Sequence, residues 1–122
     1  MNLDTDKSPF LLIHGYTQHG EKLKKKVGEW MGKSNLNNYH IYSPDGGYQA
    51  KNSEKEKVLG WWFLGKPENF AHPDTYGPKE IINKNLKNLN SLLQEIKKNL
   101  KEDQVLSILG FSQGAVMVEI LM

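Results

Sequence analysis

A serine between two glycines is the residue of this sequence best suited to covalent chemistry. Residues 110–114 read GFSQG and match the pattern G-x-S-x-G, with Ser112 at the centre. Gly110 and Gly114 allow the chain to turn so sharply that the serine is strained and exposed above a sheet. Ser112 is therefore the predicted nucleophile, able to attack an ester carbonyl. An ordinary turn of small residues between a strand and a helix is the alternative.

The negative charge that develops on an attacked carbonyl oxygen needs two hydrogen-bond donors. One is the N–H of the residue after the nucleophile, here Gln113, and the other comes from a loop after an earlier strand. Residues 14–20, HGYTQHG, supply such a loop. Since Gly15 lets the backbone approach closely, we expect the Tyr16 N–H to be the second donor, with Thr17 as the next candidate.

Apolar patterns predict the elements that position these groups. Three strands are expected. The first lies in residues 9–15, is buried on both faces and is closed by His14 and Gly15; the second begins at residue 39 and is stopped by Pro44 and a glycine pair; the third, also buried, lies in residues 104–110. The expected helices are residues 20–33, 78–100 and 114–122. Because strands and helices alternate, we expect a parallel sheet between helical layers, an α/β fold of three layers. Ligands bind such sheets at the carboxyl ends of the strands, so the loops after Ile13, Ser43 and Leu109 should share one edge.

The segment before the long helix breaks the periodic pattern. Residues 46–77 are predicted to form a loop or excursion in which aromatic residues gather. The candidate substrate-binding residues are Thr17, Trp61, Trp62 and Phe63. The three aromatic residues could line a pocket for the acyl group of an ester, although a place in the core or in an apolar lid would explain them equally well.

The helix predicted at residues 78–100 should face the core with an apolar stripe. Its members recur every three or four residues and are Ile82, Leu86, Leu89, Leu93, Ile96 and Leu100. Pro78 suits the first turn of this helix, where its missing N–H costs nothing.

Composition narrows the classes of function. The 16 basic residues are all lysine and the net charge is only +2, so a nucleic-acid partner is not expected. The absence of cysteine excludes disulfides and thiolate catalysis, and the N-terminus has neither a signal peptide nor a membrane span, so we expect a cytoplasmic protein. The loop at residues 14–20 lacks the glycine patterns of nucleotide-binding loops, which disfavours a nucleotide binder.

The four histidines all precede Ser112, and the sequence favours a structural role for each. We expect His19 to cap a helix, His40 to pack within a strand and His72 to belong to a loop, with the lining of a pocket as the alternative for His72.

Five stretches, taken in order, resemble the FSH serine hydrolases of the α/β-hydrolase superfamily, a group close to carboxylesterases and phospholipases. They are FLLIHGYTQHG, IYSPDGG, WWF, YGPKEIINKNL and ILGFSQGA. The resemblance implies an esterase-like acyl transfer with Ser112 as nucleophile and with Gln113 and Tyr16 as backbone oxyanion donors. It implies a small ester as substrate, no metal and no other cofactor. It also implies that His14 fixes its loop by a hydrogen bond and that Gly15, Gly110 and Gly114 support the two loops.

The sequence departs from this family after the nucleophile, where the family places an Asp and then a His. The ten residues that follow Ser112 contain no histidine, and their one acid is Glu119. We therefore expect residues 1–122 to be a single, truncated α/β-hydrolase domain whose Asp and His lie beyond residue 122. If the chain instead truly ends at Met122, the strand at 104–110 would be an unpaired edge, which favours a homo-oligomer or a swapped dimer. A catalytically inactive binding or interaction module on the same scaffold is the alternative function.

Overall fold

The computed structural model describes residues 7–49, 59–61 and 78–122. Three strands form a parallel sheet in the order β2-β1-β5. The central strand β1 (Ser8–Ile13) pairs with β2 (Tyr39–Tyr42) on one side and with β5 (Ser107–Gly110) on the other. Ile13 lies opposite Gly110, so the end of β1 meets the end of β5.

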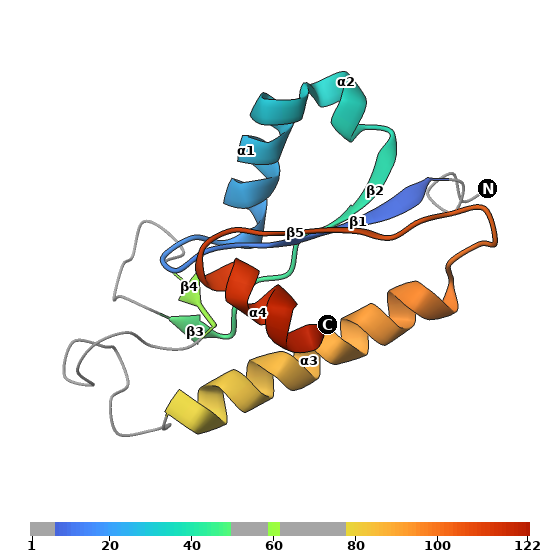
Figure 1. Ribbon diagram of the computed structural model, residues 1–122. Helices are drawn as coiled ribbons and strands as arrows, with labels where there is room; N and C mark the ends of the chain where they lie inside the picture. Colours follow the sequence, from blue (N-terminus) through green and yellow to red (C-terminus); the bar gives the residue numbers. More distant parts are fainter. Residues whose placement is uncertain (1–6, 50–58, 62–77) are drawn as a thin grey trace.

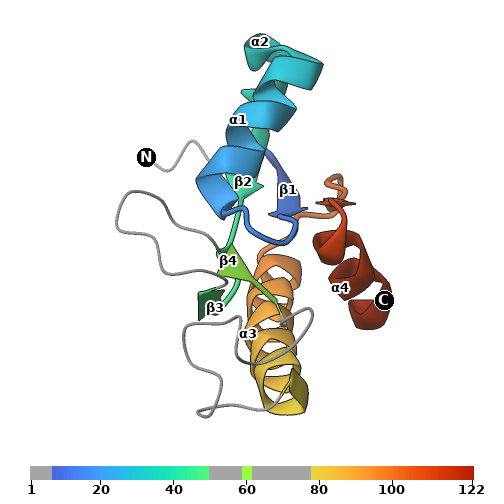
Figure 2. The ribbon, with the colours of Figure 1, turned by 90° about the vertical axis from the view of Figure 1, so that its left-hand side faces the viewer.

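Helices cover both faces of this sheet. On one face lie α1 (Gly20–Met31) and α2 (Lys33–Leu36), and on the other lie α3 (Pro78–Lys98) and α4 (Gln113–Leu121) (Figure 1). The side view in Figure 2 shows the same separation of the two helical layers. The predicted three-layer α/β fold, with a parallel sheet, is confirmed.

The alternation of side chains along β1 joins the three layers. Leu11 and Ile13 point to the face of α3 and α4, where they pack with Leu89, Leu93 and Met117. The residue before each of them, Phe10 and Leu12, points to the other face, where both pack with Leu23, Val27 and Leu36. Since successive side chains of a strand alternate between the faces of a sheet, one fully apolar strand supplies both cores.

The expected long loop at residues 46–77 contains short paired strands. β3 (Tyr48–Gln49) runs antiparallel to β4 (Leu59–Gly60), and Leu59 also bridges to Gln18 in the loop after β1. A two-residue strand leaves no periodic pattern in a sequence, which explains why these pairings were not predicted. Through these pairings, β3 and β4 lie next to each other, and β4 lies beside the loop that follows β1.

The buried face of α3 differs in part from the predicted stripe. Leu89, Leu93 and Ile96 are buried as predicted, but the N-terminal half of the helix buries Ile81 and Asn85. Ile82 and Leu86 are only partly buried, and Leu100 lies after the end of the helix. Ile82 and Leu86 still pack against the core, so the predicted stripe is confirmed there in part. Asn85 was missed because a buried asparagine does not appear in a hydrophobic pattern.

The first helix ends two residues earlier than predicted, β2 ends one residue earlier, and β5 begins three residues later. Gly32, with φ of 89°, ends α1 at Met31 and begins the separate turn α2, and β2 ends at Tyr42. β5 is partly exposed along its length and not buried, because it lies at an edge of the described sheet. Within the described ranges, no helix combines the length and apolar character needed to cross a bilayer.

Candidate active site

Ser112 sits at a strained and exposed turn between β5 and α4. Its φ of 55° and ψ of −115° place a non-glycine residue at positive φ, and the residue is exposed. Such a conformation costs about 1–3 kcal/mol and persists only where the surrounding structure enforces it. Within the described residues, the Ser112 side chain makes no capping hydrogen bond to α4. The hydroxyl is therefore presented above the edge of the sheet.

The two glycines of the pattern allow this turn to pack against the sheet. A Cβ atom at Gly110 would lie 2.6 Å from the Cα of Ala115, and one at Gly114 would overlap the carbonyl oxygen of Ile13. Both neighbours are backbone atoms, which cannot move aside without shifting β1 or α4. The turn therefore requires glycine at both positions, as the sequence pattern predicts.

The loop after β1 lies directly beside this turn. The Phe111 N–H donates to the Ile13 carbonyl at 3.0 Å, and a Cβ atom at Gly15 would meet the Phe111 carbonyl oxygen at 3.1 Å. The Gly15 N–H donates to the Gln18 side chain at 2.9 Å, which closes the loop on itself. The expected meeting of the 14–20 loop and the serine turn at one edge is thus observed.

Thr17 is excluded as a source of the second oxyanion donor. Its N–H donates to the Leu59 carbonyl at 2.7 Å, and its φ of 67° turns the chain toward that strand. Tyr16 is kept as the candidate donor, on the neighbouring residue of the same loop.

His14 holds the loops together and is not placed to act as a base. It is fully buried, and its Nε2 accepts a hydrogen bond of 2.8 Å from the Gly46 N–H. Since Nε2 accepts, the neutral ring carries its proton on Nδ1, which donates to the Gly15 carbonyl at 2.7 Å. Burial lowers the pKa of His14 and outweighs the opposite effect of the bond to Gly15. Both nitrogens are thus used for structure, as predicted.

The other described histidines also have structural roles. His19 caps the N-terminus of α1, with its side chain accepting a 3.4 Å hydrogen bond from the Lys22 N–H. His40 lies in β2 at the opposite end of the sheet from Gly110, and its ring contacts the Tyr42 hydroxyl at 3.3 Å. His72 lies outside the described residues. The predictions for His19 and His40 are confirmed.

Trp61 belongs to the core. It is 1% exposed, its ring stacks on that of His14 with centroids 4.9 Å apart, and its Nε1 donates to the His14 carbonyl at 2.8 Å. Of the three roles considered for this residue, a pocket wall, the core and an apolar lid, the structure shows the core role. Trp62 and Phe63, the neighbouring pocket candidates, lie outside the described residues.

Two buried amide side chains close to the serine turn were missed from the sequence. Gln113 was expected to act only through its backbone, yet its side chain accepts a hydrogen bond of 2.8 Å from the Trp61 N–H. Asn85 donates to the Trp61 carbonyl at 2.7 Å. Its position, four residues after Ile81 and four before Leu89, was the available signal that it lies on the buried face of α3.

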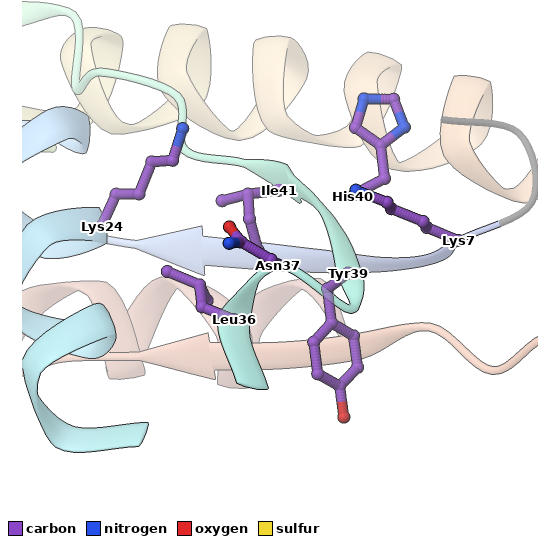
Figure 3. A pocket seen from close by; sticks show the side chains of 7 residues that line it. All are labelled: Lys7, Lys24, Leu36, Asn37, Tyr39, His40 and Ile41. Carbon is purple, nitrogen blue, oxygen red and sulfur yellow. The ribbon is translucent and has the colours of Figure 1, made fainter. Parts of the chain in front are cut away.

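Figure 3 shows a hollow elsewhere on the molecule, of about 240 Å³, that is lined by residues of α1, α2 and β2 and by one residue before β1. These residues are Lys7, Lys24, Leu36, Asn37, Tyr39, His40 and Ile41. They belong neither to the serine turn nor to the loop after β1, so this hollow is not the candidate active site.

Comparison with known proteins agrees with the geometry of the serine turn. Residues 1–122 match the family described as serine hydrolase (FSH1). An esterase of Aedes aegypti is 30% identical to the chain, in an alignment that covers 94% of this chain and 42% of the esterase. The chain thus spans less than half the length of that relative. On the match over its whole length, the chain belongs to the FSH1 family of serine hydrolases.

Proposed function

We propose that the protein hydrolyses carboxylic esters through an acyl-enzyme formed on Ser112. The observation that carries this proposal is the conformation of Ser112, exposed at positive φ between β5 and α4. Backbone conformations of this cost cluster at active sites, where the strain serves the mechanism. The esterase similarity supports the choice of an ester as substrate.

In the proposed reaction, the Ser112 oxygen attacks the ester carbonyl and loses its proton to a general base. The carbonyl oxygen becomes an oxyanion, which the N–H groups of Gln113 and Tyr16 stabilise. The positive end of the α4 dipole favours negative charge at the same place. Collapse of this intermediate expels the alcohol, which takes the proton, and leaves an acyl group on Ser112. Water then attacks the acyl group, and the acid is released.

The general base is proposed to follow Ser112 in the natural protein. α/β-Hydrolases place the nucleophile, the acid and the histidine in this chain order. The described histidines do not substitute for it, because His14 and His19 are hydrogen-bonded to backbone and His40 lies at the far end of the sheet. No observation on the described residues favours the alternative of an inactive interaction module.

Hydrolysis of p-nitrophenyl acetate by the natural gene product tests this function. We expect an initial burst of p-nitrophenol, because acylation releases the alcohol before water restores the enzyme. Ser112→Ala should abolish the burst and lower kcat by about 10⁴-fold or more, as removal of a serine nucleophile does elsewhere. Ser34→Ala, at an exposed serine of α2, is the control and should keep wild-type kinetics. Full turnover by Ser112→Ala would refute the proposal.

A further inference from the structure

The buried polar side chains behind the serine turn are unusual for this core. Asn85 is 3% exposed and Gln113 is 5% exposed, and apart from His14, which stacks on Trp61, the buried residues on this face of the sheet are apolar. A buried amide costs free energy unless its polar atoms are hydrogen-bonded, and apolar residues at the same positions would avoid that cost. The hydrogen-bond partners of these two amides should therefore explain why polar side chains are buried here.

Both amides bind the main chain of Trp61. The Trp61 N–H donates to Oε1 of Gln113 at 2.8 Å, and the Trp61 carbonyl accepts from Nδ2 of Asn85 at 2.7 Å. Asn85 also accepts, through Oδ1, a hydrogen bond of 2.9 Å from the Gly47 N–H. A Cβ atom at Gly47 would lie 2.6 Å from this oxygen, so the contact leaves no room for a side chain.

These bonds form one path from the loop after β2 to the serine turn. The path runs from Gly47 to Asn85 on α3, through the peptide groups of Trp61, and ends on the side chain of Gln113, the first residue of α4. The backbone N–H of that same residue is the proposed oxyanion donor. The side chain of Gln113 is thus held within the core, and the residue before it in the chain, Ser112, has a positive φ.

We propose that Asn85 is a positioning residue for ester hydrolysis, acting through Trp61 and the side chain of Gln113 to fix the Gln113 N–H toward the oxyanion. This inference rests on the proposed function. An oxyanion donor is effective only when the direction of its N–H is fixed before the negative charge develops. If the Gln113 peptide group becomes more mobile, the chemical step should therefore slow by more than substrate binding weakens.

The test uses Asn85→Leu and Gln113→Met, each close in shape to the natural residue, in the natural gene product. We expect kcat to fall by about tenfold to a hundredfold, less than the 10²- to 10³-fold lost with a whole oxyanion donor, while KM stays within about threefold. Asn88→Leu and Gln94→Met make the same changes on the exposed face of α3 and should leave both constants unchanged.

A second measurement does not depend on turnover. The backbone amide signal of Gln113 in the ¹⁵N-¹H spectrum should move in Asn85→Leu and stay in place in Asn88→Leu. An unmoved signal, or a folded Asn85→Leu with wild-type kcat, overturns the inference. Should wild type show no Ser112-dependent turnover, the proposed function fails, and the Gln113 signal alone then decides whether Asn85 positions this peptide.

Asn85→Asp covers the case in which Asn85→Leu does not fold. It keeps an oxygen for the Gly47 N–H and, when ionised, replaces the donor to the Trp61 carbonyl by a second acceptor oxygen, so the variant is measured at a pH at which its carboxyl group is ionised. The same loss of kcat and the same shift of the Gln113 amide signal are expected, and their absence in the folded variant overturns the inference.

Discussion

At the scale of residues, the serine turn depends on which atoms lie against its glycines. Gly114 packs on the carbonyl oxygens of Ile13 and His14, and Gly110 packs on the backbone of α4. Neither environment can yield to a methyl group in the way that a flexible side chain can. The strain at Ser112 is therefore maintained by close backbone packing on both sides of it.

Gly114→Ala should lower the free energy of unfolding by about 2 kcal/mol or more, since overpacking against rigid atoms costs about 1–3 kcal/mol. Gly28→Ala is the matched control. A Cβ atom there would meet only the end of the Leu36 side chain, at 3.3 Å, and alanine is the better residue within a helix by about 0.5–1 kcal/mol. Urea unfolding followed by circular dichroism measures both, and equal destabilisation by the two changes would contradict this packing.

The site residues that could be predicted from the sequence are those that belong to a short local pattern. Gly110, Ser112 and Gly114 form a short pattern with a geometric meaning, and the glycines have close backbone contacts while Ser112 has a positive φ. Asn85 and the side chain of Gln113 could not be found in this way, because their partners are backbone groups of Trp61, 24 and 52 positions away in the chain. Contacts of that range are set by the tertiary fold.

At the scale of elements, the loops at the carboxyl edge are tied together through His14. The neutral ring joins the end of β1 to Gly46 in the loop after β2, and Trp61 stacks on it. A protonated ring could not accept the hydrogen bond from Gly46, so charging His14 would break the link between these loops.

Stability should therefore depend on pH through His14. Its pKa is lowered in the folded protein from the ordinary value of 6.5, so below about pH 6.5 the unfolded chain binds a proton that the folded chain does not. The free energy of unfolding should fall as the pH drops from 6.5 toward the lowered pKa, by at most about 1.4 kcal/mol per pH unit from this group. Above pH 6.5 the contribution is complete.

Urea unfolding between pH 7 and pH 5 measures this dependence. His14→Gln keeps an oxygen that can accept from Gly46 and has no titrating ring, so its curve should be flatter than that of wild type, whatever its overall stability. Identical slopes for the two proteins would show that His14 does not supply this dependence.

The helices and strands could be predicted where apolar residues recur with the period of a helix or a strand. The apolar run of β1 predicted a strand buried on both faces, and Leu89, Leu93 and Ile96 predicted most of the core face of α3. The short pair of β3 and β4 carries no periodic pattern, and the partial exposure of β5 follows from its place in the sheet. Their description required the tertiary structure.

At the scale of the whole molecule, the strand order brings distant segments together. With β1 central and β5 directly beside it, the loop at residues 14–20 and the turn at Ser112 share one edge although almost a hundred positions separate them in the chain. The helices on both faces hold this edge in place (Figure 1). The central claim is that the edge presents Ser112 as a nucleophile.

Covalent labelling of the natural gene product by a fluorophosphonate probe tests that claim most directly, because such a probe reacts with an activated serine. We expect rapid labelling, with the added mass found by peptide mass spectrometry on Ser112 alone and lost in Ser112→Ala. Labelling at another serine, or equal labelling of Ser112→Ala and wild type, would contradict the account.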